Sequence, residues 1–483
     1  MPAQLRAGAA KSDITTDAPG ALINDPLYAK ALVLDDGTTT LVLLAMDVTA
    51  IGGICEVSDD FLPELRARLE SELAIPGGNV LVNASHTHPP GSILCGHEEQ
   101  VARTFDAVRR AKENLTPVKV GVGVGREDRF IINRTLRLKD GKHWTIRHAN
   151  PCPPDDEVAE LGPLDPEIGL LRVDRLDGTP LAVVYNFACH ALLGIPGGAI
   201  TANFPGGASA VIEECLGPDA MALFLQGAGG DVCEVLYKDP NRPRDCRSVG
   251  PMLGISVLEA LEGVETSDAT LKVVSETVRL PRRTDVPDRI ATLRAEQDQL
   301  LASLRFTSLN FRSFLPLYIR YALNPEHPAD YSYRYLQADA IGETDLKGMD
   351  AENRGNLDKY LSNIRAMERL ARIQDDIGTL LKHKADNDAS GEDTIAAEIM
   401  AMKIGDFVLI TAPIEVLTRV GMNVKSASPH KHTFMSAFTN GYMHYGAPAE
   451  DYDKQGYEVT ECLLGAGWQE IYEKKAAELL ARL

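Results

Sequence analysis

The stretch Asn79–His88, NVLVNASHTH, places two histidines with one residue between them at the end of an apolar run. The run predicts a β-strand, and side chains two positions apart on a strand share a face. His86 and His88 are therefore expected to point together into whatever lies above that strand. The segment Pro89–Gly91 follows directly. It would end the strand and place the pair at its carboxyl end, where open α/β sheets build their sites.

Two later segments repeat this design. Leu181–Ala191, LAVVYNFACHA, runs a predicted strand into His190, and Asp406–Glu415, DFVLITAPIE, runs another into a carboxylate. The histidine pair alone is compatible with a hydrogen-bonded polar pair as well as with a metal site. Because imidazole and carboxylate are ordinary zinc ligands, the three segments together favour a metal site.

Motifs spread over nearly the whole chain resemble the neutral ceramidase family, zinc-dependent amidases that cleave the N-acyl bond of ceramide. Jointly they are specific, although each alone would be weak. The matching motifs are Ser85-His86-Thr87-His88, Asn133-Arg134, Phe187-Ala188-Cys189-His190-Ala191, Gly230-Asp231-Val232, Pro413-Ile414-Glu415, Asn440-Gly441-Tyr442-Met443-His444-Tyr445 and Gln455-Gly456-Tyr457-Glu458.

The resemblance implies a Zn2+ ion with four ligands in this chain, namely His86, His190, Glu415 and Tyr445. A catalytic zinc site also keeps one position open for water. Tyrosine is a less common ligand, so the assignment of Tyr445 depends on the family pattern alone. Its alternative is a packed tyrosine whose hydroxyl bonds to a neighbour.

The resemblance also implies catalytic residues around the metal. His88 falls on a non-ligand histidine, which is expected to bond the developing oxyanion or relay a proton. Arg134 and Tyr457 are expected to hold the substrate carbonyl or stabilise the oxyanion. For Arg134 the alternative is a solvated or structural guanidinium. Zinc lowers the pKa of bound water from ~16 to ~7 and polarises a carbonyl, and amide hydrolysis needs both.

Cys233 is the main departure from the family pattern. The segment Gly230–Val235 reads GDVCEV, where ceramidases continue with a serine and then Pro-Asn. A thiolate beside a metal or cation would be a strong nucleophile, whereas a thiol is a poor hydrogen-bonding substitute for serine. A buried, inert cysteine is the third possibility. We favour zinc-bound water as the nucleophile and interpret Cys233 as a pocket residue that alters substrate choice.

Over roughly the first 280 residues, short apolar runs alternate with Gly/Pro turns and helical stretches, which predicts a mixed α/β enzyme with a sheet core flanked by helices. The chain has 483 residues, of which 44% are hydrophobic, enough for a large core. We expect one ceramidase-like catalytic domain over residues 1–483. In the family a β-sandwich domain follows the tyrosine-rich motif, but here the chain ends soon afterwards, so no such C-terminal domain is expected.

Residues 285–390 are expected to form a helical, aromatic-rich insertion in this domain. Apolar residues recur at helical spacing in two runs, the second predicting a helix of roughly 27 residues that ends near Leu380. Lys384–Glu392 is predicted to be an exposed loop. The aromatic residues between the runs would either line or cover a pocket, or hold the insertion onto the sheet domain.

The charge and the termini limit the classes of partner. A net charge of −20 argues against binding nucleic acid or an anionic membrane through a general electrostatic field. No apolar run reaches the ~18 residues of a membrane span, and the amino terminus lacks a secretory signal. The eight cysteines show no compact disulfide spacing. We therefore expect a cytoplasmic protein with reduced thiols, and a homo-oligomer stays open.

These inferences predict a zinc-dependent hydrolase that cleaves a C–N amide bond in a small molecule. The substrate is expected to be a linear N-acyl compound or a cyclic amide, with ceramide among the candidates. One alternative directs the same metal at an ester, lactone or phosphoester. Another is a non-catalytic zinc-binding module, against which the presence of His88, Arg134 and Tyr457 argues, since zinc binding alone would not require them.

Overall fold

The computed structural model describes residues 4–88, 93–146, 152–239 and 241–483, and these form two compact units. Unit 1 comprises Met1–Arg283 and Glu392–Leu483, and unit 2 comprises Thr284–Gly391. The prediction of one catalytic domain carrying an insertion over residues 285–390 stays a prediction.

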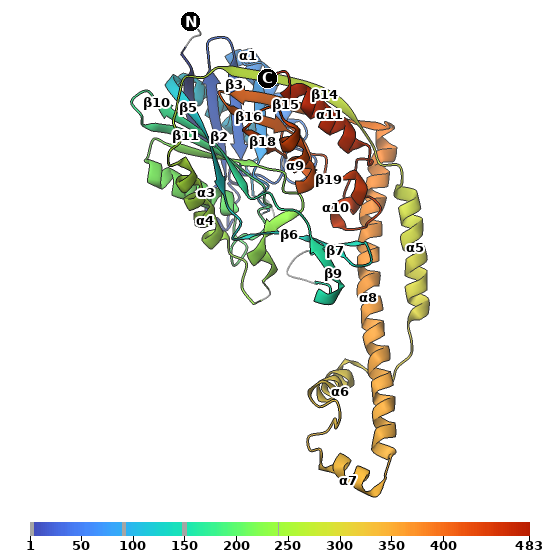
Figure 1. Cartoon of the computed structure of the whole chain (residues 1–483). Coiled ribbons are helices and arrows are strands. Elements are labelled where there is room, and N and C mark those ends of the chain that lie inside the picture. The colour runs from blue at the N-terminus through green and yellow to red at the C-terminus, as the bar shows by residue number, and fades with distance from the viewer. Residues whose placement is uncertain (1–3, 89–92, 147–151, 240) are drawn as a thin grey trace. The chain divides into compact units, whose positions relative to one another are not determined.

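Unit 1 is built on an eight-stranded mixed sheet with the strand order β12-β11-β10-β5-β1-β2-β3-β4 (Figure 1). The pairs β11–β12 and β3–β4 are parallel, and each is joined through a helix, as a parallel connection requires. The other pairs are antiparallel. The strands are β1 (Arg6–Asp13), β2 (Tyr28–Asp35), β3 (Thr40–Met46), β4 (Val80–Ala84), β5 (Thr116–Arg126), β10 (Glu167–Arg175), β11 (Pro180–Phe187) and β12 (Met221–Gln226).

A second sheet, with the order β14-β15-β16-β18, packs against the first through a shared apolar cluster. Alternation along the strands explains the packing: in β3, Leu41 and Leu43 join this cluster, whereas Val42 and Leu44 join the cluster on the other face. The strands are β14 (Leu271–Pro281), β15 (Thr394–Ile404), β16 (Phe407–Thr411) and β18 (Thr433–Ser436). The predicted mixed α/β class is confirmed.

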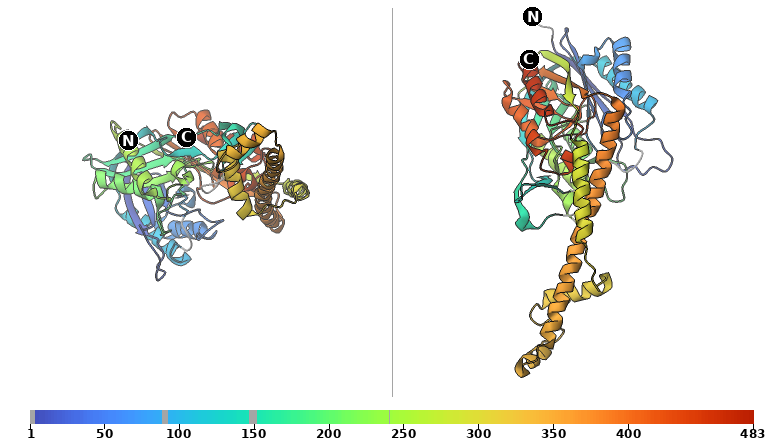
Figure 2. Two further views of the ribbon diagram at one scale, coloured as in Figure 1. Left: turned by 90° about the horizontal axis from the view of Figure 1, so that it is seen from below. Right: turned by 90° about the vertical axis from the view of Figure 1, so that its right-hand side faces the viewer.

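Helices pack on the two sheets (Figure 2). Short strands lie in the segments that connect the longer elements. Helix α2 packs on β1 and β2, α3 on β12, α4 on β5, and α11 on β14 and β15. The helices of unit 1 are α1 (Phe61–Leu73), α2 (His97–Glu113), α3 (Asn203–Leu216), α4 (Val249–Leu261), α9 (Thr418–Ala427), α10 (Tyr457–Thr460) and α11 (Trp468–Leu480). The short strands are β6 (Ile131–Asn133), β7 (Thr135–Leu138), β8 (His143–Thr145), β9 (Val158–Leu161), β13 (Val232–Glu234), β17 (Glu415–Val416) and β19 (Tyr445–Gly446).

The strand predicted over residues 79–88 is real but shorter. Strand β4 ends at Ala84, and His86 has a left-handed backbone with φ of 61°. The prediction that His86 and His88 share a strand face is therefore wrong, because neither lies on the strand. Their proximity comes from the loop that follows it. The segment Pro89–Gly91, which was expected to end the strand, lies outside the described residues.

Unit 2 is helical, as predicted. Helix α8 runs for 46 residues, far beyond the roughly 27 expected. The prediction of a loop from Lys384 is wrong, because the helix continues to Ser390 and ends at Gly391, which takes the left-handed conformation of a helix C-cap. Polar composition alone did not distinguish a solvated helix from a loop. The helices are α5 (Val286–Ser303), α6 (Phe311–Leu323), α7 (Tyr333–Ile341) and α8 (Asp345–Ser390).

None of the helices in the described part of the chain is both long enough and apolar enough to cross a bilayer.

Candidate metal centre

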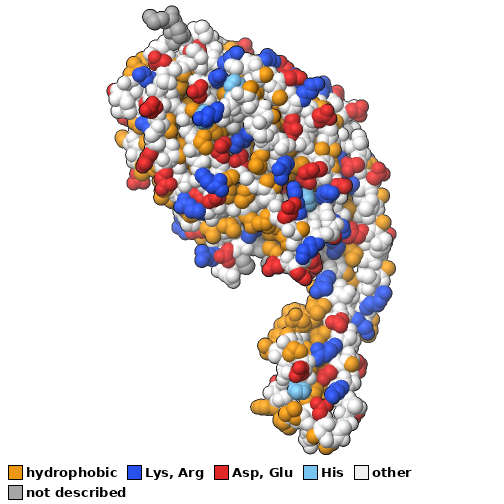
Figure 3. Space-filling view, in the orientation of Figure 1, with side chains coloured by type: hydrophobic (Ala, Val, Ile, Leu, Met, Phe, Trp, Pro, Cys, Tyr) orange, Lys and Arg blue, Asp and Glu red, His pale blue; other side chains and the backbone are white. Residues whose placement is uncertain are grey.

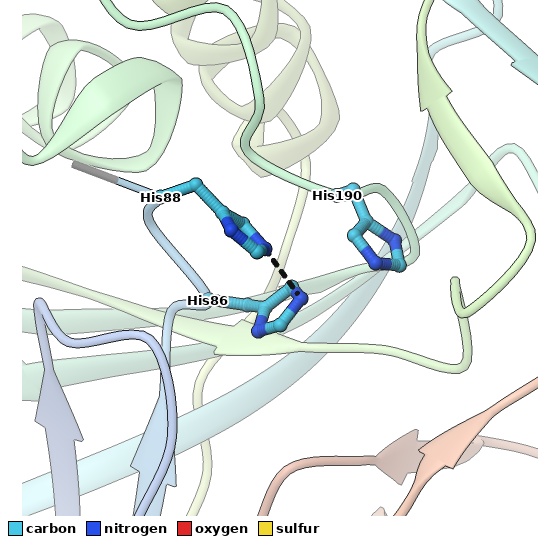
Figure 4. A group of neighbouring side chains, drawn as sticks. All are labelled: His86, His88 and His190. Carbon is cyan, nitrogen blue, oxygen red and sulfur yellow. Dashed lines mark hydrogen bonds between the residues drawn. The ribbon is translucent and has the colours of Figure 1, made fainter. Parts of the chain in front are cut away.

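Four separate segments of unit 1, two loops and two short strands, bring the predicted ligands together. His86 follows β4, and His190 follows β11. Glu415 opens β17 and lies opposite Tyr445 in the parallel β17–β19 pair. The histidine loops are tied to each other by a backbone bridge between Thr87 and Ala191. Side chains from widely separated segments of the chain thus meet at one point, and Figure 4 shows the histidines facing each other there.

Backbone carbonyls decide which ring nitrogen of each buried histidine carries the proton. His86 Nδ1 lies 2.7 Å from the carbonyl oxygen of Thr49, and His190 Nδ1 lies 2.7 Å from that of Gly229. A carbonyl oxygen can only accept, so both Nδ1 atoms must donate. In the neutral rings this leaves the Nε2 lone pairs unprotonated, as a metal ligand requires.

The Nε2 lone pairs of His86 and His190 lie close to the carboxylate of Glu415. Glu415 Oε2 lies 3.5 Å from His86 Nε2 and 3.1 Å from His190 Nε2, and Tyr445 Oη lies 3.4 Å from His190 Nε2. Bonds of ~2.0–2.1 Å to a tetrahedral zinc separate its ligands by about 3.3 Å. The donor set and its spacing therefore fit a zinc ion.

The pKa values of His86, His190 and Glu415 also indicate that the cluster is stabilised by a cation. Burial lowers the pKa of His86 to about 4, and burial together with the charge of Arg134 lowers the pKa of His190. Burial would raise the pKa of the Glu415 carboxyl, whereas positive charge on His86 and His190, with the hydroxyl of Tyr442, holds it well below its usual range. With both imidazoles neutral, the three groups present only acceptors to one another, and a bound cation would supply the missing positive charge.

His86 adopts an uncommon backbone conformation to reach this position. Its φ of 61° is left-handed, and its N–H donates to the carbonyl of Val48 at 2.9 Å. Three further non-glycine residues near the site, Phe438, Asn440 and His444, share the left-handed region. Backbone strain of this kind collects at functional sites, where the surrounding structure supports it.

His88 lies on the exposed side of the centre. Its Nε2 is 2.9 Å from Nε2 of His86, and because the latter is an acceptor, His88 is the donor. One ring nitrogen from each of His86, His88 and His190 lies within 4.8 Å of the other two, so the three residues form a three-histidine group. His88 is thus placed either to bind the metal or to act beside it, and its predicted role as a non-ligand stays a prediction.

Arg134 is buried, so the solvated alternative does not apply. Its Nη2 donates to Tyr445 Oη at 2.9 Å and to the carbonyl of Gly230 at 3.0 Å. Its Nε donates to Glu458 Oε1 at 2.8 Å. Burial would lower the pKa of the guanidinium, but Tyr445 and Glu458 raise it well above the usual value. A permanent positive charge therefore lies one hydrogen bond from the candidate ligand Tyr445.

Two residues of the site were given no role from the sequence. Glu458 is buried, and while Oε1 accepts from Arg134, Oε2 accepts from Thr135 Oγ1 at 3.0 Å and Thr145 Oγ1 at 2.5 Å. Tyr442 donates to Glu415 Oε1. Both lie inside the quoted motifs, and a carboxylate directly after Tyr457 was the available signal for Glu458.

Tyr457 is half-buried and begins helix α10 beside the cluster. Its ring meets the ring of Tyr445 edge-on at 5.5 Å, and the Arg134 guanidinium carbon lies 5.8 Å from its centroid. The structure thus brings Tyr457 together with Arg134 and Tyr445. Its contact with substrate stays a prediction.

Cys233 lies in β13, with its side chain in an apolar cluster. Its backbone pairs with His190, so the residue adjoins the site. Burial raises the pKa of the thiol to about 12. A thiolate nucleophile is therefore disfavoured relative to an inert or pocket-lining thiol.

A comparison with solved structures finds chains of the same fold. A neutral ceramidase from Pseudomonas aeruginosa superposes with a TM-score of 0.63 at 18% identity, covering 99% of this chain and 74% of that one. A ceramidase complexed with C2 superposes with a TM-score of 0.62 at 17% identity, covering 99% and 75%. No family model and no curated protein matches the sequence. The protein therefore has a divergent ceramidase-like fold.

Proposed function

We propose that the protein is a zinc-dependent hydrolase that cleaves a C–N amide bond in a small molecule. The observation that carries this proposal is the acceptor-only cluster of His86, His190 and Glu415, whose spacing fits zinc and whose tautomers are set by backbone carbonyls. The ceramidase-like fold supports the same reaction class.

The proposed ligands are His86, His190, Glu415 and Tyr445. A zinc ion held by them would polarise the scissile carbonyl and lower the pKa of a bound water. Tyr442 and Gly229 support this set: the first donates to the outer oxygen of Glu415, and the second fixes the ring of His190. Such supporting contacts orient ligands and strengthen metal binding.

Arg134 and Tyr457 are proposed to hold the substrate carbonyl and stabilise negative charge on its oxygen. The buried guanidinium is positioned by Glu458 and Gly230 before any substrate arrives. Its charge therefore requires little reorganisation during the reaction, which is the condition for effective electrostatic stabilisation.

His88 is proposed to move the proton. It is the exposed histidine of the cluster, and its Nε2 reaches the centre, 2.9 Å from His86 Nε2. Once the lone pair of His86 Nε2 is committed to a metal, it no longer accepts from His88. The proton of His88 would then lie on Nδ1, and its Nε2 could take a proton from the attacking water and return it to the leaving amine. Cys233 is proposed to shape the neighbouring pocket wall rather than to attack the substrate.

The substrate is proposed to be an N-acyl compound or a cyclic amide. The two similar structures are described as ceramidases, which makes ceramide one member of the substrate panel.

The test measures metal content by plasma mass spectrometry together with turnover of this panel. About one zinc per wild-type chain is expected, and His190→Ala should lose both the metal and amide hydrolysis. His97→Ala is the matched control, because His97 bonds to Ser58 and Glu64 and not to the cluster.

Two outcomes would overturn the proposal. A wild type that binds no metal after zinc reconstitution would remove the metal-dependent mechanism. Zinc binding with turnover of esters, lactones or phosphoesters, and none of amides, would reassign the reaction.

A further inference from the structure

Helix α6 of unit 2 exposes a broad apolar face, and Arg312 lies on the same side of the helix in its first turn. Phe311 is 65% exposed and Leu323 is 82% exposed, at the two ends of this face. The spacing of its residues, i, i+4, i+7, i+8 and i+12, places them on one side of a helix. The face consists of Phe311, Leu315, Tyr318, Ile319 and Leu323, all exposed.

The opposite side of α6 is already packed. Phe314 and Tyr321 are buried in a cluster with Leu357 of α8, and the rings of Phe314 and Tyr360 stack at 4.4 Å. Tyr321 Oη also donates to Asp350 Oδ1 at 2.5 Å. Unit 2 therefore holds the helix by one side, and the exposed face is the side left for another partner.

The start of α6 is fixed as well. Asn310 and Ser313 form a reciprocal capping box, in which each side chain bonds to the other's backbone N–H. The helix is thus formed and oriented within unit 2 before any partner binds. Contiguous exposed apolar faces of this kind mark interaction sites on monomeric proteins. Figure 3 shows hydrophobic side chains gathered on this part of unit 2.

Local charge identifies the kind of partner. The segment Arg305–Leu323 contains Arg305, Arg312 and Arg320 and no acidic residue, although the whole chain has a net charge of −20. A partner that suits this segment is apolar and anionic at once. A second copy pairing face to face through α6 would instead bring two cationic helices together, which like-charge repulsion opposes.

We propose that α6 docks onto the surface of an anionic lipid bilayer. The helix lies in the plane of the headgroups, with its apolar face in the acyl boundary and its arginines among the phosphates. Interfacial helices combine a broad apolar face with arginines whose long side chains reach the headgroups. In α6 these are Arg312, at one end of the apolar side, and Arg320, which also lies 3.9 Å from Asp330. Electrostatic attraction to anionic lipid adds to the apolar burial. Because no described helix can span a bilayer, the attachment is to its surface.

The test uses the full chain and vesicle co-sedimentation. Wild type is expected to bind phosphatidylcholine vesicles that contain about 20% phosphatidylserine more tightly than vesicles without it. Leu315→Glu/Ile319→Glu should weaken binding at least ~10-fold, because it places charge in the apolar face. These lipids contain no amide bond, so the result is independent of the proposed hydrolysis.

Two variants serve as comparisons. Leu176→Glu makes the same kind of change at a residue of unit 1 that is 56% exposed, and it should bind vesicles like wild type. Arg312→Gln/Arg320→Gln should lose the preference for phosphatidylserine and keep the weaker binding to neutral vesicles. Circular dichroism checks that each variant keeps its helix content.

Three results would overturn the proposal. The first is a wild type that does not sediment with anionic vesicles. The second is an equal loss of vesicle binding in Leu176→Glu and in Leu315→Glu/Ile319→Glu. A dimer detected by light scattering that Leu315→Glu/Ile319→Glu abolishes, with no vesicle binding by wild type, would assign the face to a second copy.

Discussion

The candidate metal centre of unit 1 and the exposed face of α6 in unit 2 depart from ordinary burial in opposite directions. Around the centre, polar and ionisable groups are inside, and Glu415 is only 2% exposed. On α6, large apolar side chains face solvent. Ionisable residues are seldom fully buried without a partner, and contiguous apolar faces are seldom left exposed.

The difference shows which kind of partner each region needs. Buried imidazoles and a carboxylate that present acceptors to one another require positive charge, which a metal ion supplies. An exposed apolar face with arginines on the same helix would suit an apolar, anionic surface, as proposed above. Each expectation follows from what the local contacts leave unsatisfied, and each can be tested by substitution in one region with a control in the same region.

The largest effect is expected for Glu415→Gln. The amide keeps the shape but removes the negative charge that faces His86 and His190, so zinc content should fall and turnover should drop at least ~10³-fold. Metal analysis and amide hydrolysis measure the two effects. Glu64→Gln, at a surface glutamate that bonds His97, is the control. Full zinc content in Glu415→Gln would remove this residue from the ligand set.

Arg134→Lys tests charge positioning without removing charge. A lysine cannot bond Glu458, Gly230 and Tyr445 in the same fork, so kcat should fall about 10²–10³-fold while zinc content is kept. Steady-state kinetics of the zinc-loaded protein measure this loss. An unchanged kcat would show that the guanidinium is structural only.

Phe314→Ala tests the packed side of α6. Removing a buried ring from the cluster with Leu357 and Tyr360 should lower the free energy of unfolding of unit 2 by about 3 kcal/mol. The matched variant Phe311→Ala, on the exposed face, should change it by less than about 0.5 kcal/mol. Amide hydrogen exchange over α6 measures both. Equal losses would mean that the outer face is packed as well.

His88→Ala separates the two possible roles of the exposed histidine. If His88 moves a proton, kcat should fall about 10²-fold with zinc retained. Zinc analysis and a kinetic measurement on the same preparation decide this. Loss of zinc together with activity would instead place His88 among the ligands, in the three-histidine group.

Cys233→Ser is expected to have the smallest effect. The thiol is buried with a pKa raised to about 12, so it contributes little thiolate, and kcat/KM should change by less than about tenfold. Substrate preference within the panel is the sensitive readout. A loss near that of Glu415→Gln would make Cys233 a nucleophile.

Local sequence pattern predicted the elements better than their ends. The strands predicted within Leu181–Ala191 and Asp406–Glu415 are present as β11 and β16, because their apolar runs are strong signals. The ends of β4 and α8 were missed. His86 takes a left-handed conformation set by its contact with Val48, and the polar end of α8 continues as a solvated helix.

The sequence by itself determined the α/β class and the residue types needed for a zinc site, because periodicity and ligand chemistry are local properties. Only the tertiary structure decided how these residues meet. Strands β4 and β12 lie at opposite ends of the strand order, yet Asn83 Oδ1 accepts from the N–H of Gln226 at 2.9 Å. The lone pairs of His86 and His190 face Glu415 because distant carbonyls hold their rings, and such long-range contacts leave no periodic signal in the chain.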